Sequence, residues 1–173
     1  MHPNGTVFVI CHNNGLYLIE GETLGGPYKN KNLNTMPSRW TSQLTAEHGW
    51  IDKVVWEDPH LWFDADGNWH VICHTYPQGG GAFNVVVGGH GFSADGLEWH
   101  WSALPPFTVN VTHASGNGGG GKTVTYGTRE RPFLFGTPFK PGRPAALFSG
   151  VTIFPKQKVG HDYSFTLVQS IIT

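Results

Sequence analysis

Apolar residues in this chain come in short runs that are separated by glycine-rich turns. One run, Val-Ile-Cys-His at 71–74, follows the turn Asp-Gly-Asn at 66–68, and another, at 84–92, ends in Gly-His-Gly-Phe. Short runs that are rich in β-branched and aromatic residues and bounded by glycine are typical of β-strands. Long amphipathic runs of Ala, Leu, Glu and Lys, which would indicate helices, are missing. The pattern predicts an all-β fold.

Two phrases of this pattern repeat along the chain. Val-Ile-Cys-His occurs at 9–12 and again at 71–74, each time starting four residues after a turn glycine. A weaker copy, Ala-Leu-Phe-Ser at 146–149, keeps the same spacing. The second phrase, Glu-x-Pro-x-Leu, occurs at 57–61 and 130–134. Because both phrases recur at nearly the same offset, they belong to one larger repeating unit.

The best-preserved copy of this unit predicts four short antiparallel strands. The first strand begins at Glu57 and the second ends near His74. The third strand runs to Ser93, where the sequence Ser-Ala-Asp-Gly predicts a tight turn, and the fourth strand lies within 97–104. Four antiparallel strands per repeat describe one blade of a β-propeller.

We therefore expect a single domain over 1–173, a partial β-propeller of four-stranded blades, with about one complete blade and two incomplete ones. The blade units approximate to 1–50, 51–112 and 128–173. The first unit lacks the Glu-x-Pro strand, which indicates truncation at the N-terminus. Incomplete blades expose strand edges that need partners. We expect a homodimer or a higher homo-oligomer in which chains complete each other's blades.

Composition argues against several classes of partner. Charged residues make up 13% of the chain and the net charge is -1, which gives no electrostatic reason to expect nucleic acid or an anionic membrane. No apolar run is long enough for a transmembrane helix. The N-terminal sequence lacks the pattern of a secretory signal, so the localisation stays open.

The motifs also carry a family resemblance. The strings WEDPHLWFDADGNWHVICHTY, GGHGFSADGLEWHWS and RERPFLF, the last followed by PAALFSGV, resemble the five-bladed β-propeller glycoside hydrolases of the family 43 type, which include arabinanases and xylosidases. The resemblance implies a hydrolase of an oligosaccharide or another small molecule, with three acidic residues at the mouth of a central channel. Asp58 and Glu130 match two of these catalytic positions, the stabilising aspartate and the general acid. The first-blade carboxylate has no match.

The predicted substrate contacts lie near these carboxylates. Glycosidic cleavage needs one group that protonates the leaving oxygen and a carboxylate that activates water or attacks the anomeric carbon. Arginines on both sides of Glu130 would tune it, although adjacent cations favour its ionised form and work against an acid role. The predicted contacts are Arg129, Arg131, Trp56 and His90.

Ten histidines are unusual for a chain of this length. Repeat-equivalent residues on successive blades converge around a channel, so we predict that His12, His60 and His74 bind a divalent ion, either calcium or zinc. A wider group of candidates includes His48 and His90. A bound ion would activate water and so favours an alternative function, a metal-dependent ester or phosphoester hydrolase. The simpler interpretation is that these histidines form hydrogen bonds between blades.

A second alternative is a carbohydrate-binding remnant without catalysis. Its sugar-stacking platforms would come from the tryptophans of the repeat, Trp56, Trp62, Trp69 and Trp99. In either case Cys11 and Cys73 alternate away from the histidines on their strands, and we expect both to pack between blades as small hydrophobic residues.

The stretch at 116–123 satisfies the phosphate-binding pattern G-x-x-x-x-G-K-[ST]. That pattern also needs a helix after it, and the sequence that follows, VTYGTRERP, has the β-branched residues, glycine and proline of a strand and turn. We predict instead a glycine-rich hairpin loop at 114–122 between strands near 107–113 and 122–127.

Overall fold

The regular structure of this chain is β-strand throughout the residues that the computed structural model describes, which are 5–12, 16–32, 54–77, 87–102, 104–114, 121–136, 143–153 and 164–171. Every strand pairing is antiparallel. The predicted all-β fold is confirmed. Across these same ranges there is no helix with the length and hydropathy needed to cross a membrane.

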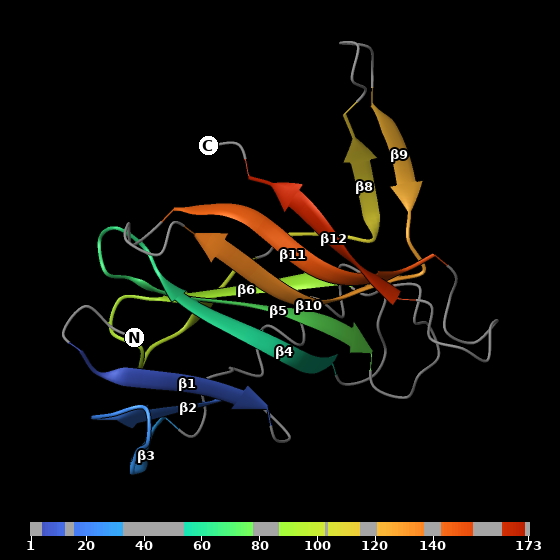
Figure 1. The fold of residues 1–173 in the computed structure, drawn as a ribbon. Coiled ribbons are helices and arrows are strands. Elements are labelled where there is room, and N and C mark those ends of the chain that lie inside the picture. Colours follow the sequence, from blue (N-terminus) through green and yellow to red (C-terminus); the bar gives the residue numbers. More distant parts are fainter. Residues whose placement is uncertain are drawn as a thin grey trace.

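Three sheets lie one after another in Figure 1, and each is built from strands that are consecutive in the sequence. The first sheet contains β1 (Val7–His12), β2 (Leu16–Gly21) and β3 (Tyr28–Asn32). The second contains β4 (Val54–Phe63), β5 (Trp69–Pro77), β6 (Val87–Ser93) and β7 (His100–Trp101). The third contains β10 (Thr128–Gly136), β11 (Pro144–Thr152) and β12 (Ser164–Ser170). This up-and-down order is that of propeller blades, and the second sheet has the four strands that the repeat predicts.

The fourth strand of the second sheet is shorter than the sequence suggests. The preceding turn forms as predicted, because the backbone N–H of Gly96 donates to Ser93 Oγ over 2.9 Å. The Asp95 carboxylate then accepts from the N–H groups of Leu97 at 2.8 Å and Glu98 at 3.0 Å. These two N–H groups are bound within the loop, so the strand starts only at His100.

A hairpin lies between the second and third sheets in the sequence. It consists of β8 (Asn110–His113) and β9 (Lys122–Thr125), and it extends away from the sheets in Figure 1. The predicted hairpin is therefore confirmed with shorter strands, although most of its glycine-rich loop, 115–120, lies outside the described residues. Because a strand follows this loop, it has no helix N-terminus with which to bind a phosphate.

Side chains alternate between two faces of each sheet, which we call face a and face b. Face a carries the cross-strand pairs Ile10 and Leu18, His60 and Ile72, and Phe133 and Phe148. Face b carries the pairs Val9 and Ile19, Leu61 and Val71, and Leu134 and Leu147.

Face a of one sheet packs on face b of the next sheet, and this arrangement occurs twice. The core between the first and second sheets contains Leu18, Trp69, Val71 and Trp99, with Phe8, Ile10 and Leu61 packed against them. The core between the second and third sheets contains Ile72, Phe107 and Leu147, with Trp62 and Leu134 packed against them. The hairpin adds a further core with Val111, Tyr126, Val151 and Leu167. The removal of this apolar surface from water is what holds the sheets together.

The two cysteines differ in burial. Cys73 is fully buried, as predicted, and burial raises the pKa of its thiol. Cys11 is exposed, and the two residues are not joined in a disulfide. The prediction that Cys11 packs between blades is wrong, because it lies on face b of the first sheet, against which the described residues place no further sheet.

Candidate functional site

The repeated Glu-x-Pro phrase forms the same backbone feature in the second and third sheets. The central residues Asp58 and Arg131 have φ angles of 50° and 54°. The strand register shifts at both places, between Glu57 and His60 and between Glu130 and Phe133. A positive φ costs energy for a residue with a Cβ, and a bulge redirects the side chains next to it. The phrase therefore marks two equivalent bulges, which we call the first bulge (57–59) and the second bulge (130–132).

The first bulge surrounds a buried histidine. The side chain of His74 on β5 is only 2% exposed. Its Nε2 lies 3.5 Å from Glu57 Oε2, and its Nδ1 lies 3.3 Å from Asp58 Oδ2. Both carboxylates are partly open to solvent, with side-chain exposures of 38% for Glu57 and 41% for Asp58.

The protonation of His74 is set by opposing effects. Burial lowers its pKa from the ordinary value of 6.5, and the Arg131 guanidinium lowers it further. The carboxylates of Asp58, Glu130 and Glu57 act in the opposite direction and raise the pKa, but the lowering prevails. At neutral pH the imidazole is therefore uncharged. A neutral imidazole carries one N–H, so only one of the two carboxylate contacts can be a hydrogen bond from His74.

The second bulge faces the same cluster. The Glu130 side chain is 9% exposed, and Arg131 Nη1 donates to its Oε2 over 3.2 Å. The same guanidinium reaches the first bulge, with its Nε 3.9 Å from Asp58 Oδ2. Asp58 and Glu130, the two predicted catalytic residues, are thus linked through Arg131. Carboxylates outnumber cations in this acidic cluster, which we define as Glu57, Asp58, His74, Glu130 and Arg131.

The register of the third sheet corrects one detail of the sequence alignment. Glu57 pairs with His74, and Glu130 pairs with Gly150. The repeat at 146–149 predicts Ser149 at that place. A second register shift, between Phe135 and Gly136, displaces the pairing by one residue. The second bulge therefore has no side chain opposite its glutamate.

One part of the acidic cluster has the geometry of a cation site. Glu57, Asp58 and His74 each offer one ligand atom, and these atoms all lie within 4.8 Å of one another. An uncharged imidazole retains a nitrogen lone pair for a metal. Among the described residues, this is the group of three such side chains that lie close enough together.

The other predicted metal ligands lie apart from this group. His60 is on the same face of the sheet, but its ring packs 4.6 Å from that of Phe133, and burial lowers its pKa. His12 ends β1 in the first sheet, and its side chain is outside the described part of the chain, as is all of His48. Of the three histidines predicted to bind metal, only His74 is placed beside carboxylates by the described residues.

Arg129, a predicted substrate contact, points away from the acidic cluster. It is 2% exposed, and its guanidinium donates to Ser149 Oγ, the carbonyl oxygen of Thr108 and Gln169 Oε1. Burial lowers its pKa to about 10. The strand alternation explains this orientation, since Arg129 follows face b while Glu130 follows face a. In this structure Arg129 joins strands rather than meeting a solvent-open site.

Three of the four repeat tryptophans are core residues. Trp56, Trp69 and Trp99 are 7%, 5% and 6% exposed, and Trp56 packs on Trp101 with ring centroids 5.1 Å apart. A sugar ring needs an open aromatic face, so the prediction that these three form stacking platforms is not supported by the structure. Trp62 is half-buried beneath two histidines.

His90, the remaining predicted substrate contact, belongs to a second polar group on the same sheet. Its Nε2 lies 3.0 Å from His70 Nδ1, and His70 Nε2 lies 3.2 Å from Asp64 Oδ2. Burial raises the pKa of the Asp64 carboxylate, but hydrogen bonds, above all from Asn68, lower it by more. The pKa is therefore lowered to about 2. Burial and the neighbouring His70 lower the pKa of His90 to about 4. Asp64 thus holds the His70 ring through Nε2, and the donor in the contact between His70 and His90 is whichever of the two nitrogens carries the proton.

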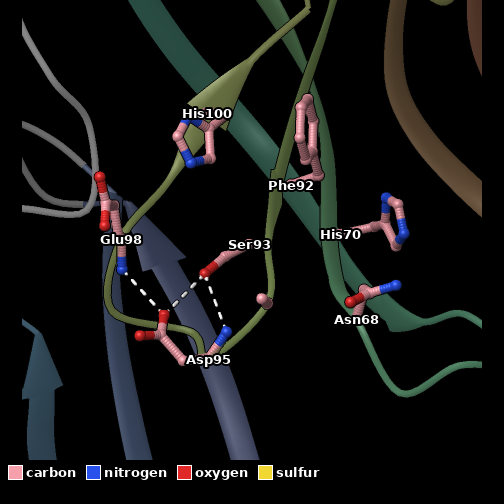
Figure 2. A pocket seen from close by; sticks show the side chains of 8 residues that line it. Asn68, His70, Phe92, Ser93, Asp95, Glu98 and His100 are labelled. Atoms are coloured by element: carbon pink, nitrogen blue, oxygen red, sulfur yellow. Dashed lines mark hydrogen bonds between the residues drawn. The ribbon is translucent and has the colours of Figure 1, made fainter.

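A shallow pocket of about 370 Å³ opens beside this second group. Figure 2 shows the rings of Phe92 and His100 on neighbouring strands, with Glu98 and Asp95 at the turn below them. The remaining lining residues are Asn68, His70, Ser93 and Ala94. The pocket does not include any member of the acidic cluster, so the two groups are separate features of the second sheet.

Comparison with known proteins gives a distant likeness to a solved structure. No family model matches the chain, and no curated protein matches it. Among solved structures, an endo-arabinase from Bacteroides thetaiotaomicron is similar over 100% of this chain and 73% of that chain, with 13% sequence identity and a TM-score of 0.40. A likeness of this size does not bear on activity.

The sequence reasoning missed Glu57 as a member of the site. The signal was present in the repeat, because the glutamate of the phrase is as regular as its proline. In a regular strand Glu57 and Asp58 would point to opposite faces, and a linear pattern does not show that a bulge turns both carboxylates toward one histidine.

Proposed function

We propose that this chain is a hydrolase whose reaction centre is the acidic cluster, with a divalent cation held by Glu57, Asp58 and His74. The observation that carries the proposal is the position of His74, which is buried between two carboxylate oxygens at 3.3 and 3.5 Å. A neutral imidazole has one N–H for these two contacts. A shared cation would bridge the ligand atoms of Glu57, Asp58 and His74, which all lie within 4.8 Å of one another, and would offset the excess negative charge.

The donor set suits a transition-metal ion better than calcium. Calcium prefers six to eight oxygen ligands, whereas zinc takes imidazole nitrogen together with carboxylate oxygen. Three protein ligands with partial exposure leave a coordination position for water or substrate. We therefore propose zinc or a zinc-like ion at this site.

Each remaining residue of the cluster has a role in this proposal. A bound ion of this type lowers the pKa of water and polarises an ester, phosphoester or glycosidic oxygen. Glu130 accepts the proton of the attacking water and later delivers it to the leaving group. Arg131 holds Glu130 in place through the 3.2 Å hydrogen bond and, being 63% exposed, can also meet negative charge on the substrate.

The test begins with the metal alone. Metal analysis of the purified protein and calorimetric titration with zinc and with calcium should give one zinc site. Glu57→Gln combined with Asp58→Asn should weaken zinc binding by more than the roughly 100-fold that loss of an outer-shell partner costs. The matched control, Glu22→Gln combined with Glu98→Gln, removes two charges from exposed positions and should leave zinc binding intact. Equal zinc binding in the two double variants would contradict the cation site.

Activity is then measured with chromogenic glycosides, esters and phosphoesters. Turnover that is lost with a chelator and restored by zinc supports metal-assisted hydrolysis. Oligosaccharide binding without any turnover would instead indicate a binding-only protein and overturn the hydrolase proposal.

A metal-independent glycosidase is the second candidate. The observation in its favour is that two equivalent bulges bring together carboxylates with different surroundings, Asp58 at 41% exposure and Glu130 at 9%. A glycosidase uses such a pair in two roles. Sugar release that is insensitive to the chelator but lost in both Asp58→Asn and Glu130→Gln would decide for this candidate.

A further inference from the structure

The third sheet leaves an aromatic face open to solvent. Phe133 and Phe135 are each 51% exposed and Val168 is 55% exposed. Both phenylalanine rings contact Phe148, with centroids 6.3 and 6.1 Å away. These four residues, which we call the aromatic face, lie on face a of the third sheet. Contiguous apolar groups of this kind mark interaction surfaces on soluble proteins.

The same positions in the other sheets are covered. By strand register, Phe133 and Phe148 correspond to His60 and Ile72 of the second sheet. Ile72 is 3% exposed, because face b of the third sheet packs on it through Leu147. Face a of the first sheet is covered in the same way by face b of the second sheet. The aromatic face touches the second sheet where the Phe133 ring meets His60. Among the described residues no further sheet packs on it, and Phe133, Phe135 and Val168 stay about half exposed.

A complementary surface lies at the other end of the series. Face b of the first sheet presents Val9, which is 37% exposed, and the exposed Cys11. The partner of Val9 across the strands is Ile19, which is half-buried. Face b is the surface that meets face a in both internal contacts, and here it too has no described sheet against it.

We propose that the aromatic face of one copy of this chain docks on face b of the first sheet of a second copy. The contact repeats between chains the packing of face a on face b that occurs twice within the chain. Because two different surfaces meet, the interface is head-to-tail and builds a ring if the rotation closes. This occupant is favoured over a symmetric pairing of two aromatic faces, because both hydrophobic cores between the described sheets join a face a to a face b.

Disulfide trapping tests the orientation of the contact. Val168→Cys places a thiol on the aromatic face, and the native Cys11 lies on the opposite surface, while Cys73 is fully buried. Under mild oxidation this variant should form disulfide-linked dimers and larger species on a non-reducing gel. Adding Cys11→Ser should abolish them. The control Leu104→Cys, at a residue that is 78% exposed outside both surfaces, should give no linked ladder.

The outcomes separate three arrangements. Linked dimers that persist when Cys11→Ser is added would mean that two aromatic faces meet, and would overturn the head-to-tail contact. Sedimentation of the unmodified protein as a monomer at every concentration would overturn the assembly itself. If the proposal holds, Phe135→Asp shifts the assembly to monomer with an unchanged far-ultraviolet circular dichroism spectrum, whereas Leu104→Asp leaves it assembled.

Discussion

The two bulges share a backbone and differ in what surrounds them. Each has a non-glycine residue at positive φ followed by proline, and each shifts the register of its strand pair. The first bulge carries Asp58 and faces His74, whereas the second carries Arg131 and faces Gly150. One copy therefore concentrates negative charge around an imidazole, and the other supplies a cation and a more buried glutamate.

This difference shows how a repeat can build one site rather than two. The bulge aims side chains at the boundary between neighbouring sheets, and both copies aim at the same place. If the second bulge repeated the residues of the first, more carboxylates would meet there without a cation, and like charges would repel. With arginine at the second bulge, the two copies are complementary, as the contacts of Arg131 with Asp58 and Glu130 indicate.

The largest effect is expected when the glutamate of the second bulge is neutralised. Glu130→Gln should lower kcat by about 10²- to 10⁴-fold, because it removes the proposed acid and base, while zinc binding at the first bulge is retained. The rate is measured on the chromogenic substrate that the native protein turns over best. Glu98→Gln, in the separate pocket, serves as the control. A Glu130→Gln enzyme as fast as this control would mean that the second bulge does not take part in the chemistry.

The next prediction converts the second bulge into a copy of the first. Arg131→Asp combined with Gly150→His places the residue types of the first site at equivalent positions, and a Cβ at Gly150 would meet only the carbonyl oxygen of Glu130, at 3.7 Å. Calorimetry should then find two zinc ions per chain, one more than the single ion proposed for the native protein. Gly150→His alone should stay at one, because Arg131 occupies the position of the third ligand. A single site in the double variant would show that register and bulge are not sufficient for the donor geometry.

The order of the strands could be predicted from the sequence, but the arrangement of the site residues at the two bulges could not. The repeat predicted the four-stranded sheet, the turn at Ser93 and a strand at both Glu-x-Pro phrases. It placed the start of these strands too late, because β4 begins at Val54 and β10 at Thr128. It could not predict the bulges, since positive φ at an aspartate or an arginine is contrary to local preference. Nor could it place Gly150 opposite Glu130, because a register shift later in the strand moved the pairing by one residue. Packing between sheets decided these points.

A smaller effect is expected from titration at the first bulge. Because the pKa of His74 is lowered from 6.5, the unfolded chain binds more protons below that pH than the folded chain does. Stability is therefore full above about pH 6.5 and falls as the pH drops toward the lower pKa of the folded state, by up to about 1.4 kcal/mol per pH unit for one histidine. His74→Gln should make the acid slope of the unfolding free energy shallower in urea titrations of metal-free protein. Gly150→Ala, at the equivalent position, should leave the slope unchanged.

The smallest effect is expected from backbone strain, which the two bulges have in common. Substitution by glycine and substitution by alanine both remove the functional group of the side chain. The difference in unfolding free energy between the two variants therefore measures the cost of positive φ. Asp58→Gly should be more stable than Asp58→Ala by about 1 kcal/mol, and Arg131→Gly should exceed Arg131→Ala by a similar amount. Denaturant unfolding measures both differences. At Thr123, in the regular strand β9, the order should reverse, because glycine weakens an ordinary strand.

If the glycine variant were more stable than the alanine variant at only one bulge, the two bulges would not be equivalent. The two copies would then share a sequence phrase without sharing a strained backbone, and the meeting of Asp58 with Arg131 would depend on side-chain contacts alone. An equal advantage at both would mean that the strain is retained for position. Each bulge then stores about the same unfavourable energy. The strained backbone in return holds Asp58 beside His74 and Arg131 beside Glu130.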